Sequence, residues 1–260
     1  MLHLIRELKA EFIKYRGTLV YWLMILCPFA IAFLLFLGMS MGTSKLVANA
    51  VAKGKNPWEV WIMVHYRVLG IFFLPLYIAM VNGMIYAREH RHNTWKHLYT
   101  LPIPGWSIEL SKNIFSLLIN FTTVLIFALY IFLSGYIISL IKPHMNFMDY
   151  NPMIAFNLLM ALKIFLASFS IWVLHNWLAR RFSNFGLNIG VALLGVVSAG
   201  LMLQGWKHVQ YFLYALPIVS VIDAKNMHTL FTHPVLLSII SGSVVWVISF
   251  WEVQRRKVKA

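Results

Sequence analysis

Acidic side chains and cysteine are scarce in this chain, and each scarcity excludes a class of site. Of 260 residues, 8 are Asp or Glu against 22 Lys and Arg, and Cys27 is the single cysteine. One cysteine rules out a disulfide framework and a thiolate metal site. Ser, His and acidic residues are too scattered to indicate the catalytic site of a hydrolase. The carboxylates are also too few to favour a proton-driven carrier. The sequence also lacks the G-x-x-x-x-G-K-[ST] phosphate-binding loop, so the chain cannot hydrolyse ATP by that route.

Apolar residues are abundant and gather in long runs. They make up 60% of the chain and charged residues 12%, whereas a soluble domain is about half apolar and a quarter charged. Six runs are long enough to span a membrane, and all should be helices, because lipid offers no partner for unpaired backbone groups. They are Thr18–Leu37, Val68–Tyr86, Ile114–Ile141, Ala155–Trp177, Leu187–Leu203 and Val235–Trp251. The predicted fold class is an all-α integral membrane protein with one transmembrane domain over residues 1–260.

Basic residues lie at the ends of these runs and indicate the orientation. With the N-terminus inside, the inner segments hold four, four, two and four Lys or Arg, whereas the outer loops together hold seven. Positive charge is retained on the cytoplasmic side of membrane proteins, so both termini should be cytoplasmic. The net charge of +14 is then a topology signal, and no nucleic-acid partner is expected.

A seventh apolar run, His208–Ile222, is interrupted by Pro217. At the rise of an α-helix it would reach about 22 Å, short of the roughly 30 Å hydrocarbon core. Counting it as a span would also place the basic C-terminus outside. We therefore expect residues 205–234 to form an outer region that is re-entrant or interfacial and packs on protein.

The segment before the first span, residues 1–17, has the pattern of an amphipathic helix. One face carries Leu4, Ile5, Leu8 and Phe12, and the other carries Arg6, Glu7, Lys9 and Lys14. Such a helix lies in the membrane interface with its basic residues facing anionic lipid.

Two features are predicted on the outer side. The connection Gly38–Arg67 is the longest, and Trp58 and Trp61 should lie at the outer interface. Lys163 lies inside the fourth span, where an unpaired charge is costly. Its side chain either snorkels outward or pairs with Asp223. If the two pair, our hypothesis is that they gate the outer end of a transport pathway.

Small residues four apart mark the fifth span: Gly186 with Gly190, and Gly195 with Ala199. Small side chains let helices approach closely. This span should therefore pack in the core of the chain or at a dimer seam.

The charged segment 88–112 between the second and third spans is too long for a simple turn. Asn93 or Thr94 can cap a helix, and Trp95, Leu98 and Tyr99 then share one face. Pro102 and Pro104 end it, leaving a short helix parallel to the membrane. The residues alone leave two interpretations open: a docking surface that passes force to two spans, or an interfacial anchor.

This segment resembles the signature loop of ABC-2 type transporter permeases. The similarity lies in Glu89, Asn93-Thr94-Trp95-Lys96-His97-Leu98, Thr100-Leu101-Pro102 and Glu109-Leu110-Ser111-Lys112. Its Thr-Trp-Lys and Leu-Pro are most similar to the permeases of lantibiotic-protection and bacitracin-type exporters. The resemblance implies that an ATPase subunit contacts Glu89, Asn93, Thr94, Trp95, Leu98, Leu101 and Pro102. Asn93 stands where the family usually has Gly, and Asn tolerates turn and cap geometry.

The resemblance also implies the partners. A separate ABC ATPase would hold ATP and Mg, so this chain needs no cofactor, and a second permease, identical or similar, would complete the pathway. The cargo would be amphipathic or a peptide antibiotic, expelled from a bacterial cell membrane as resistance or bacteriocin self-immunity. The alternative is a membrane-embedded metal enzyme using His90, His92 and His97, although Glu89 is the only acid near them. A scaffold that binds a partner without transport is a further alternative.

Overall fold

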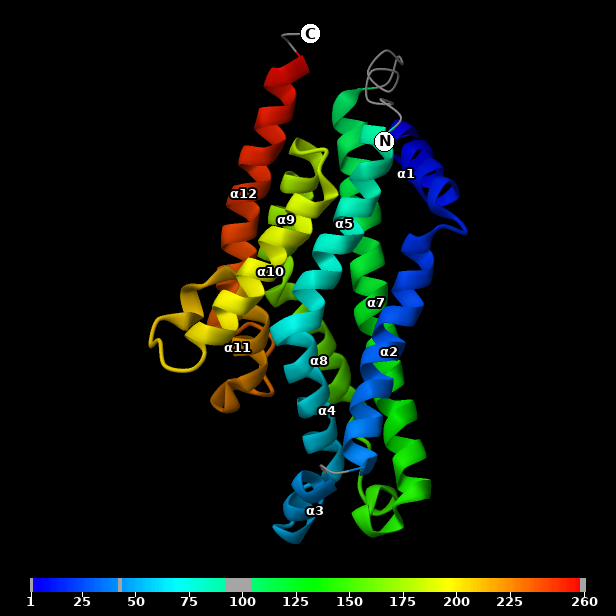
Figure 1. Ribbon diagram of the computed structural model, residues 1–260, viewed down its shortest axis with the longest axis vertical. Helices are drawn as coiled ribbons and strands as arrows, with labels where there is room; N and C mark the ends of the chain where they lie inside the picture. Colours follow the sequence, from blue (N-terminus) through cyan, green and yellow to red (C-terminus); the bar gives the residue numbers. More distant parts are fainter. Residues whose placement is uncertain (1, 42–43, 92–103, 258–260) are drawn as a thin grey trace.

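The computed structural model describes residues 2–41, 44–91 and 104–257, and all regular structure in these ranges is helical. Figure 1 shows an elongated bundle of long helices. The helices are α1 (Leu2–Tyr15), α2 (Leu19–Met41), α3 (Ser44–Ala52), α4 (Pro57–Val68), α5 (Leu74–Arg91), α7 (Gly105–Ile141), α8 (Ile154–Ala167), α9 (Phe169–Arg181), α10 (Phe185–Met202), α11 (Leu216–Ile222) and α12 (His233–Lys257). A π-helical segment, Leu69–Phe73, joins α4 to α5, and short 3-10 turns lie between α7 and α8 and around α11.

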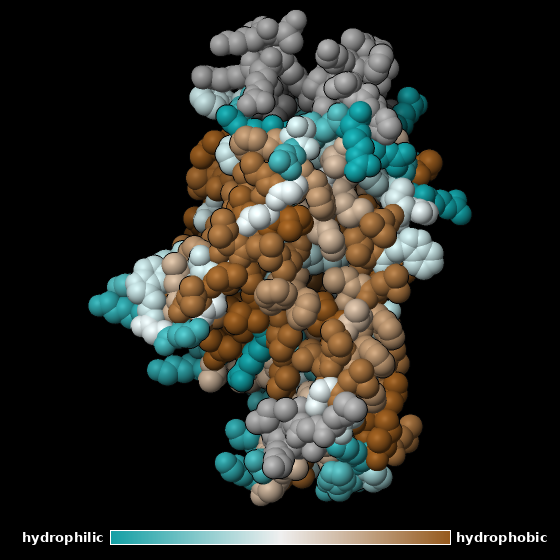
Figure 2. Space-filling model, in the orientation of Figure 1, coloured by the Kyte–Doolittle hydropathy of each residue, from teal (hydrophilic) through white to brown (hydrophobic). Residues whose placement is uncertain are grey.

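Five helices are long and apolar enough to cross a membrane, and a sixth span results if α8 and α9, bent by 43°, count as one. The first five are Leu19–Ser40, Pro57–Arg91, Gly105–Ile141, Phe185–Met202 and His233–Glu252. Each of the six predicted runs overlaps one of these spans, which confirms an all-α integral membrane protein. On the face seen in Figure 2, apolar side chains cover most of the bundle, and hydrophilic ones gather toward its two ends and on the projection at the left, where the chain runs from α10 to α11.

The predicted outer connection Gly38–Arg67 is largely helical instead, because α3 and α4 occupy it. Asn56 caps α4 by accepting a hydrogen bond from the Trp58 amide at 2.9 Å, and Pro57 suits the first helical position. Trp58 and Trp61 were expected at the interface but are 1% and 0% exposed. They are buried because their indole N–H groups find acceptors inside the bundle, on the carbonyls of Phe147 and Ile131.

The third span also begins earlier than its apolar run, at Gly105 instead of Ile114. Its first turns contain Ser107, Glu109 and Lys112, all with no exposed surface. At 1.5 Å per residue, the 37 residues of α7 reach about 55 Å, well beyond the roughly 30 Å core. A hydropathy pattern sees only the apolar middle of such a helix.

The run His208–Ile222 forms 3-10 turns followed by the short helix α11. It packs on protein as expected, and its backbone at Pro217 and Ile218 lies close to Gly70 of the π-helical segment. A Cβ added to Gly70 would lie 3.3 Å from the Ile218 nitrogen. Because Gly70 has no side chain, the backbone of α11 can pack directly against the π-helical segment.

One end of the bundle gathers several segments that are distant in sequence. There α5 ends at Arg91, α7 begins at Gly105, and α1 and the last turns of α12 lie beside them (Figure 1). We call this the loop end. The opposite end carries α3 and the turns between α7 and α8.

Candidate functional site at the loop end

The predicted coupling segment connects α5 to α7 at the loop end. Six of the residues predicted to contact an ATPase lie outside the described part of the chain: Asn93, Thr94, Trp95, Leu98, Leu101 and Pro102. Glu89 is described, and its residue is only 2% exposed. Its carboxylate faces the interior of the bundle, toward α1 and α7.

Four charged side chains of alternating sign meet there, and we call Glu11, Lys14, Glu89 and Lys112 the charge square. Lys112 Nζ donates to Glu11 Oε1 at 2.6 Å and to Glu89 Oε1 at 2.7 Å. Lys14 Nζ donates to Glu89 Oε1 and lies 3.8 Å from Glu11 Oε1. The square therefore joins α1, the last turns of α5 and the first turns of α7.

Burial makes these contacts mutually dependent. Lys112 has no exposed surface and Glu11 and Glu89 almost none. A buried charge is tolerated only while its partners compensate the lost hydration. Burial and the Lys112 ammonium lower the pKa of Lys14 to about 7. Lys14, the most exposed member, is thus the one that gives up its charge most readily.

Aromatic and backbone contacts hold α1 in the same place. The Tyr15 hydroxyl donates to the Ile85 carbonyl at 2.6 Å, and its ring stacks on Phe115 with centroids 5.1 Å apart. Burial raises the pKa of the Tyr15 hydroxyl, which keeps it a hydrogen-bond donor. The Arg88 guanidinium carbon lies 5.6 Å from the centroid of the Tyr15 ring.

The helical character of α1 is confirmed, but its predicted division into faces is wrong in part. Lys14 was expected to face lipid and lies in the charge square instead. Ile5 and Phe12 of the predicted apolar face do lie on the outside of the bundle, with exposed fractions of 54% and 36%, and Ile13 is also exposed, at 74%. The helix rotates this way because it buries Glu11 and Tyr15, whose polar atoms have partners on α5 and α7.

A second ionic cluster joins α7 to α9 and α12 at the same end. Arg180 Nη1 lies 3.4 Å from Glu109 Oε2, and Arg180 Nη2 donates to Ser249 Oγ at 2.6 Å. Arg181 pairs with Glu252 nearby. Because Glu109 and Lys112 are three residues apart on α7, the first turns of α7 contact both clusters.

Below these charges the bundle interior stays polar. Tyr86 of α5 donates to Asn176 of α9 at 2.9 Å and to Asn113 of α7 at 3.3 Å. The Trp172 indole donates to Ser116 at 2.9 Å. These bonds hold α5, α7 and α9 in one register, since buried polar groups are costly when separated from their partners.

Lys163, the embedded cation, is bonded on the opposite half of the bundle. Its residue has no exposed surface, and its ammonium donates to the Asn226 carbonyl at 2.8 Å. The Asn226 amide donates in turn to Asp223 Oδ2 at 3.0 Å. Lys163 and Asp223 are therefore brought near one another with Asn226 between them.

A family model described as "ABC-2 family transporter protein" matches residues 7–199. This chain belongs to the ABC-2 transporter family. The match includes α1 from its sixth residue on, the charge square and Lys163. No curated protein and no solved structure matches the chain significantly. Family membership makes the chain a multi-pass membrane permease of the ABC exporter type, a class that works with an ABC ATPase subunit.

The histidines of the ABC-2 permease do not gather, as far as the structure describes them. His90 lies near the Ala179 carbonyl at 3.1 Å, and His175 is held between Asn188 and Tyr214. No group of three His, Cys, Asp or Glu that could hold a metal ion occurs in the described residues. His92 and His97 lie outside them. No contact in the described chain favours the alternative of a metal enzyme.

Sequence reasoning missed Glu11 and the structural role of Lys112 in the permease. Lys112 was counted among the basic topology residues and in the family-like sequence Glu109-Leu110-Ser111-Lys112, but no partner was predicted for it, and Glu11 was given no role. One signal was available: Glu11 and Tyr15 are four residues apart on α1, so they share a face. Their partners on α5 and α7 are 70 to 101 residues distant, and periodicity carries no information about such pairs.

Proposed function

We propose that the chain is one transmembrane half of an ATP-driven ABC-2 exporter whose segment 92–103 docks on the ATPase subunit. The Lys112–Glu89 contact of 2.7 Å carries this proposal, because it bridges the two flanks of that segment. A loop transmits force only if its ends are held firmly. The charge square and the Arg180–Glu109 cluster provide that support by joining the flanks to α1, α9 and α12.

The working complex contains two permeases, identical or similar, and two ATPase subunits that bind ATP and Mg. It lies in a bacterial cell membrane with both termini in the cytoplasm. Closure of the ATPases on ATP pushes on Thr94–Leu101 and moves α5 and α7. The distribution of Lys and Arg supports this orientation.

The cargo is an amphipathic molecule, with a peptide antibiotic expelled as self-protection the first candidate. Support for this substrate comes from the Thr-Trp-Lys and Leu-Pro sequences of the loop. Lys163 and Asp223 act as a gate toward the outer side. Lys163→Met and Asp223→Asn should each reduce resistance to the cargo, and unchanged resistance in both variants removes the gate from the proposal.

Affinity purification from native membranes tests the central claim. The tagged chain should retain a polypeptide containing a phosphate-binding loop, identified by mass spectrometry. Trp95→Ala and Leu98→Glu should release it, because they remove the apolar face of the docking helix. Trp206→Ala is the matched control, an exposed tryptophan after α10, and should retain the partner. A chain that purifies alone and carries stoichiometric metal contradicts the proposal.

A further inference from the structure

Two residues of the charge square lie on α1, a helix that is not part of the predicted coupling segment. Glu11 and Lys14 of α1 contact Lys112 and Glu89, which flank that segment. Each ammonium lies near both carboxylates, so the charges alternate around the square. Moving α1 away would leave buried charges without partners, and the three helices are therefore expected to move as one body.

The connection from α1 to α2 is short and braced by hydrogen bonds. Three residues separate the helices, and the Thr18 hydroxyl donates to the Tyr15 carbonyl at 2.6 Å. Gly17 has a φ of +73°, which a glycine adopts without strain. A displacement of α1 is consequently passed to α2.

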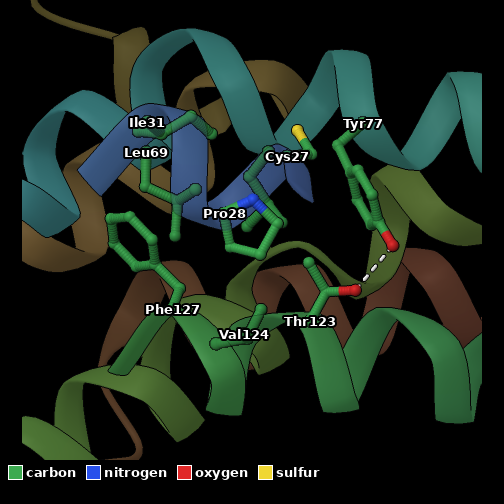
Figure 3. A pocket seen from close by; sticks show the side chains of 9 residues that line it. Cys27, Pro28, Ile31, Leu69, Tyr77, Thr123, Val124 and Phe127 are labelled. Carbon is green, nitrogen blue, oxygen red and sulfur yellow. Dashed lines mark hydrogen bonds between the residues drawn. The ribbon is translucent and has the colours of Figure 1, made fainter. Parts of the chain in front are cut away.

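A small crevice lies where α2 meets its neighbours (Figure 3). Cys27 and Pro28 of α2 line one side, and Leu69, Tyr77 and Phe127 line the others. Its interior free volume is only about 10 Å³, so the helices around it are nearly in contact. Helix α2 packs mainly on α7 and touches α5 little, so this side is the less closely packed one.

Both walls of the crevice contain a break in a helix. Pro28 removes a backbone hydrogen bond inside α2. The facing wall includes Leu69, the first residue of the π-helical segment. Helices bend at such breaks, so α2 and α5 can separate here without unfolding.

We propose that Glu11 and Lys14 are positioning residues of the transport cycle, which carry the movement of the α5 and α7 ends to α1 and α2. The crevice beside Cys27 opens and closes as a result. This inference rests on the proposed function, because the ATPase supplies the movement.

Cys27 is the single cysteine and therefore a native reporter of the crevice. In the complex purified with its ATPase, the rate of Cys27 labelling by N-ethylmaleimide is measured without nucleotide and with ATP plus vanadate. The wild type should show a several-fold difference between the two states, and Glu11→Gln should lose it. Glu7→Gln, the same change one turn earlier on α1, should keep it. Cys27→Ala gives the background.

Lys14→Met is a second and milder variant, because Lys112 still contacts both carboxylates. It should reduce the nucleotide-dependent difference while the ATPase remains bound. A full difference in both variants overturns the inference and leaves the proposed function standing. A wild type that binds its ATPase but shows no nucleotide effect at Cys27 does the same. A wild type that binds no ATPase overturns both.

Discussion

Lys112 shows how a single charge is accommodated inside this bundle. Its ammonium has no exposed surface and two carboxylates within 2.7 Å. Arg181 offers a contrast, since its pair with Glu252 lies at an exposed position. The same kind of ion pair thus occurs in two environments. The contribution of the ion pair to the free energy of unfolding should be smaller at the exposed position, because water screens the charges there.

Substituting each cation by methionine measures that difference. Lys112→Met leaves Glu11 and Glu89 buried with only the more exposed Lys14 of the charge square beside them, and should lower the free energy of unfolding by about 3–5 kcal/mol. Arg181→Met, the matched control, should cost about 1 kcal/mol or less. Denaturant titration in mixed micelles provides both values. Equal losses would show that the square contributes no more than a surface pair.

Glycine positions on α10 make a second residue-scale comparison. A Cβ on Gly195 would lie 2.5 Å from the Tyr214 ring, whose hydroxyl is bonded to His175. A Cβ on Gly190 would meet nothing within 4 Å. Gly195→Ala should therefore destabilise the chain by about 1–3 kcal/mol through overpacking, whereas Gly190→Ala should be neutral or slightly stabilising. Thermal unfolding of both variants, followed by tryptophan fluorescence, decides the matter; equal midpoints contradict the close approach.

At the scale of elements, hydropathy located each span but not its ends. The apolar middles of α2, α7 and α10 follow from the rule that lipid-facing helices must be apolar. The apolar run starts only at Ile114, so hydropathy missed the first turns of α7, although Ser107 and Glu109 suit the start of a helix. They are buried by partners on other helices, and a window along one helix cannot detect such partners.

The candidate site was predictable to a similar degree. The sequence placed Glu89 between the second and third spans, and the structure has it in the last turns of α5. It could not show that Glu89 turns inward to Lys112 and Lys14. It also could not show that Asn226 lies between Lys163 and Asp223. Both outcomes depend on helix rotation, which is set by all the contacts of a helix together.

At the scale of the whole molecule, the loop end unites the starts and ends of distant segments. Helix α1, the end of α5, the start of α7 and the last turns of α12 all lie there (Figure 1). The chain must therefore cross the bilayer an even number of times between α1 and the end of α12. Six spans satisfy this condition when α8 and α9 form one bent span. On this count the segment with α11 is predicted to add no crossing.

Reporter fusions test this topology directly. A fluorescent protein fused after Ala260 should be fluorescent, because the Lys and Arg residues near the C-terminus predict a cytoplasmic location for it. A phosphatase that is active only outside the cytoplasm should be active when fused after Asn146, in the turns between α7 and α8. It should be inactive after Arg181, at the loop end. An active phosphatase after Ala260 would require an odd number of spans and would make α11 part of a seventh crossing. That outcome would separate α12 from the loop end and contradict the contact between Arg180 and Ser249.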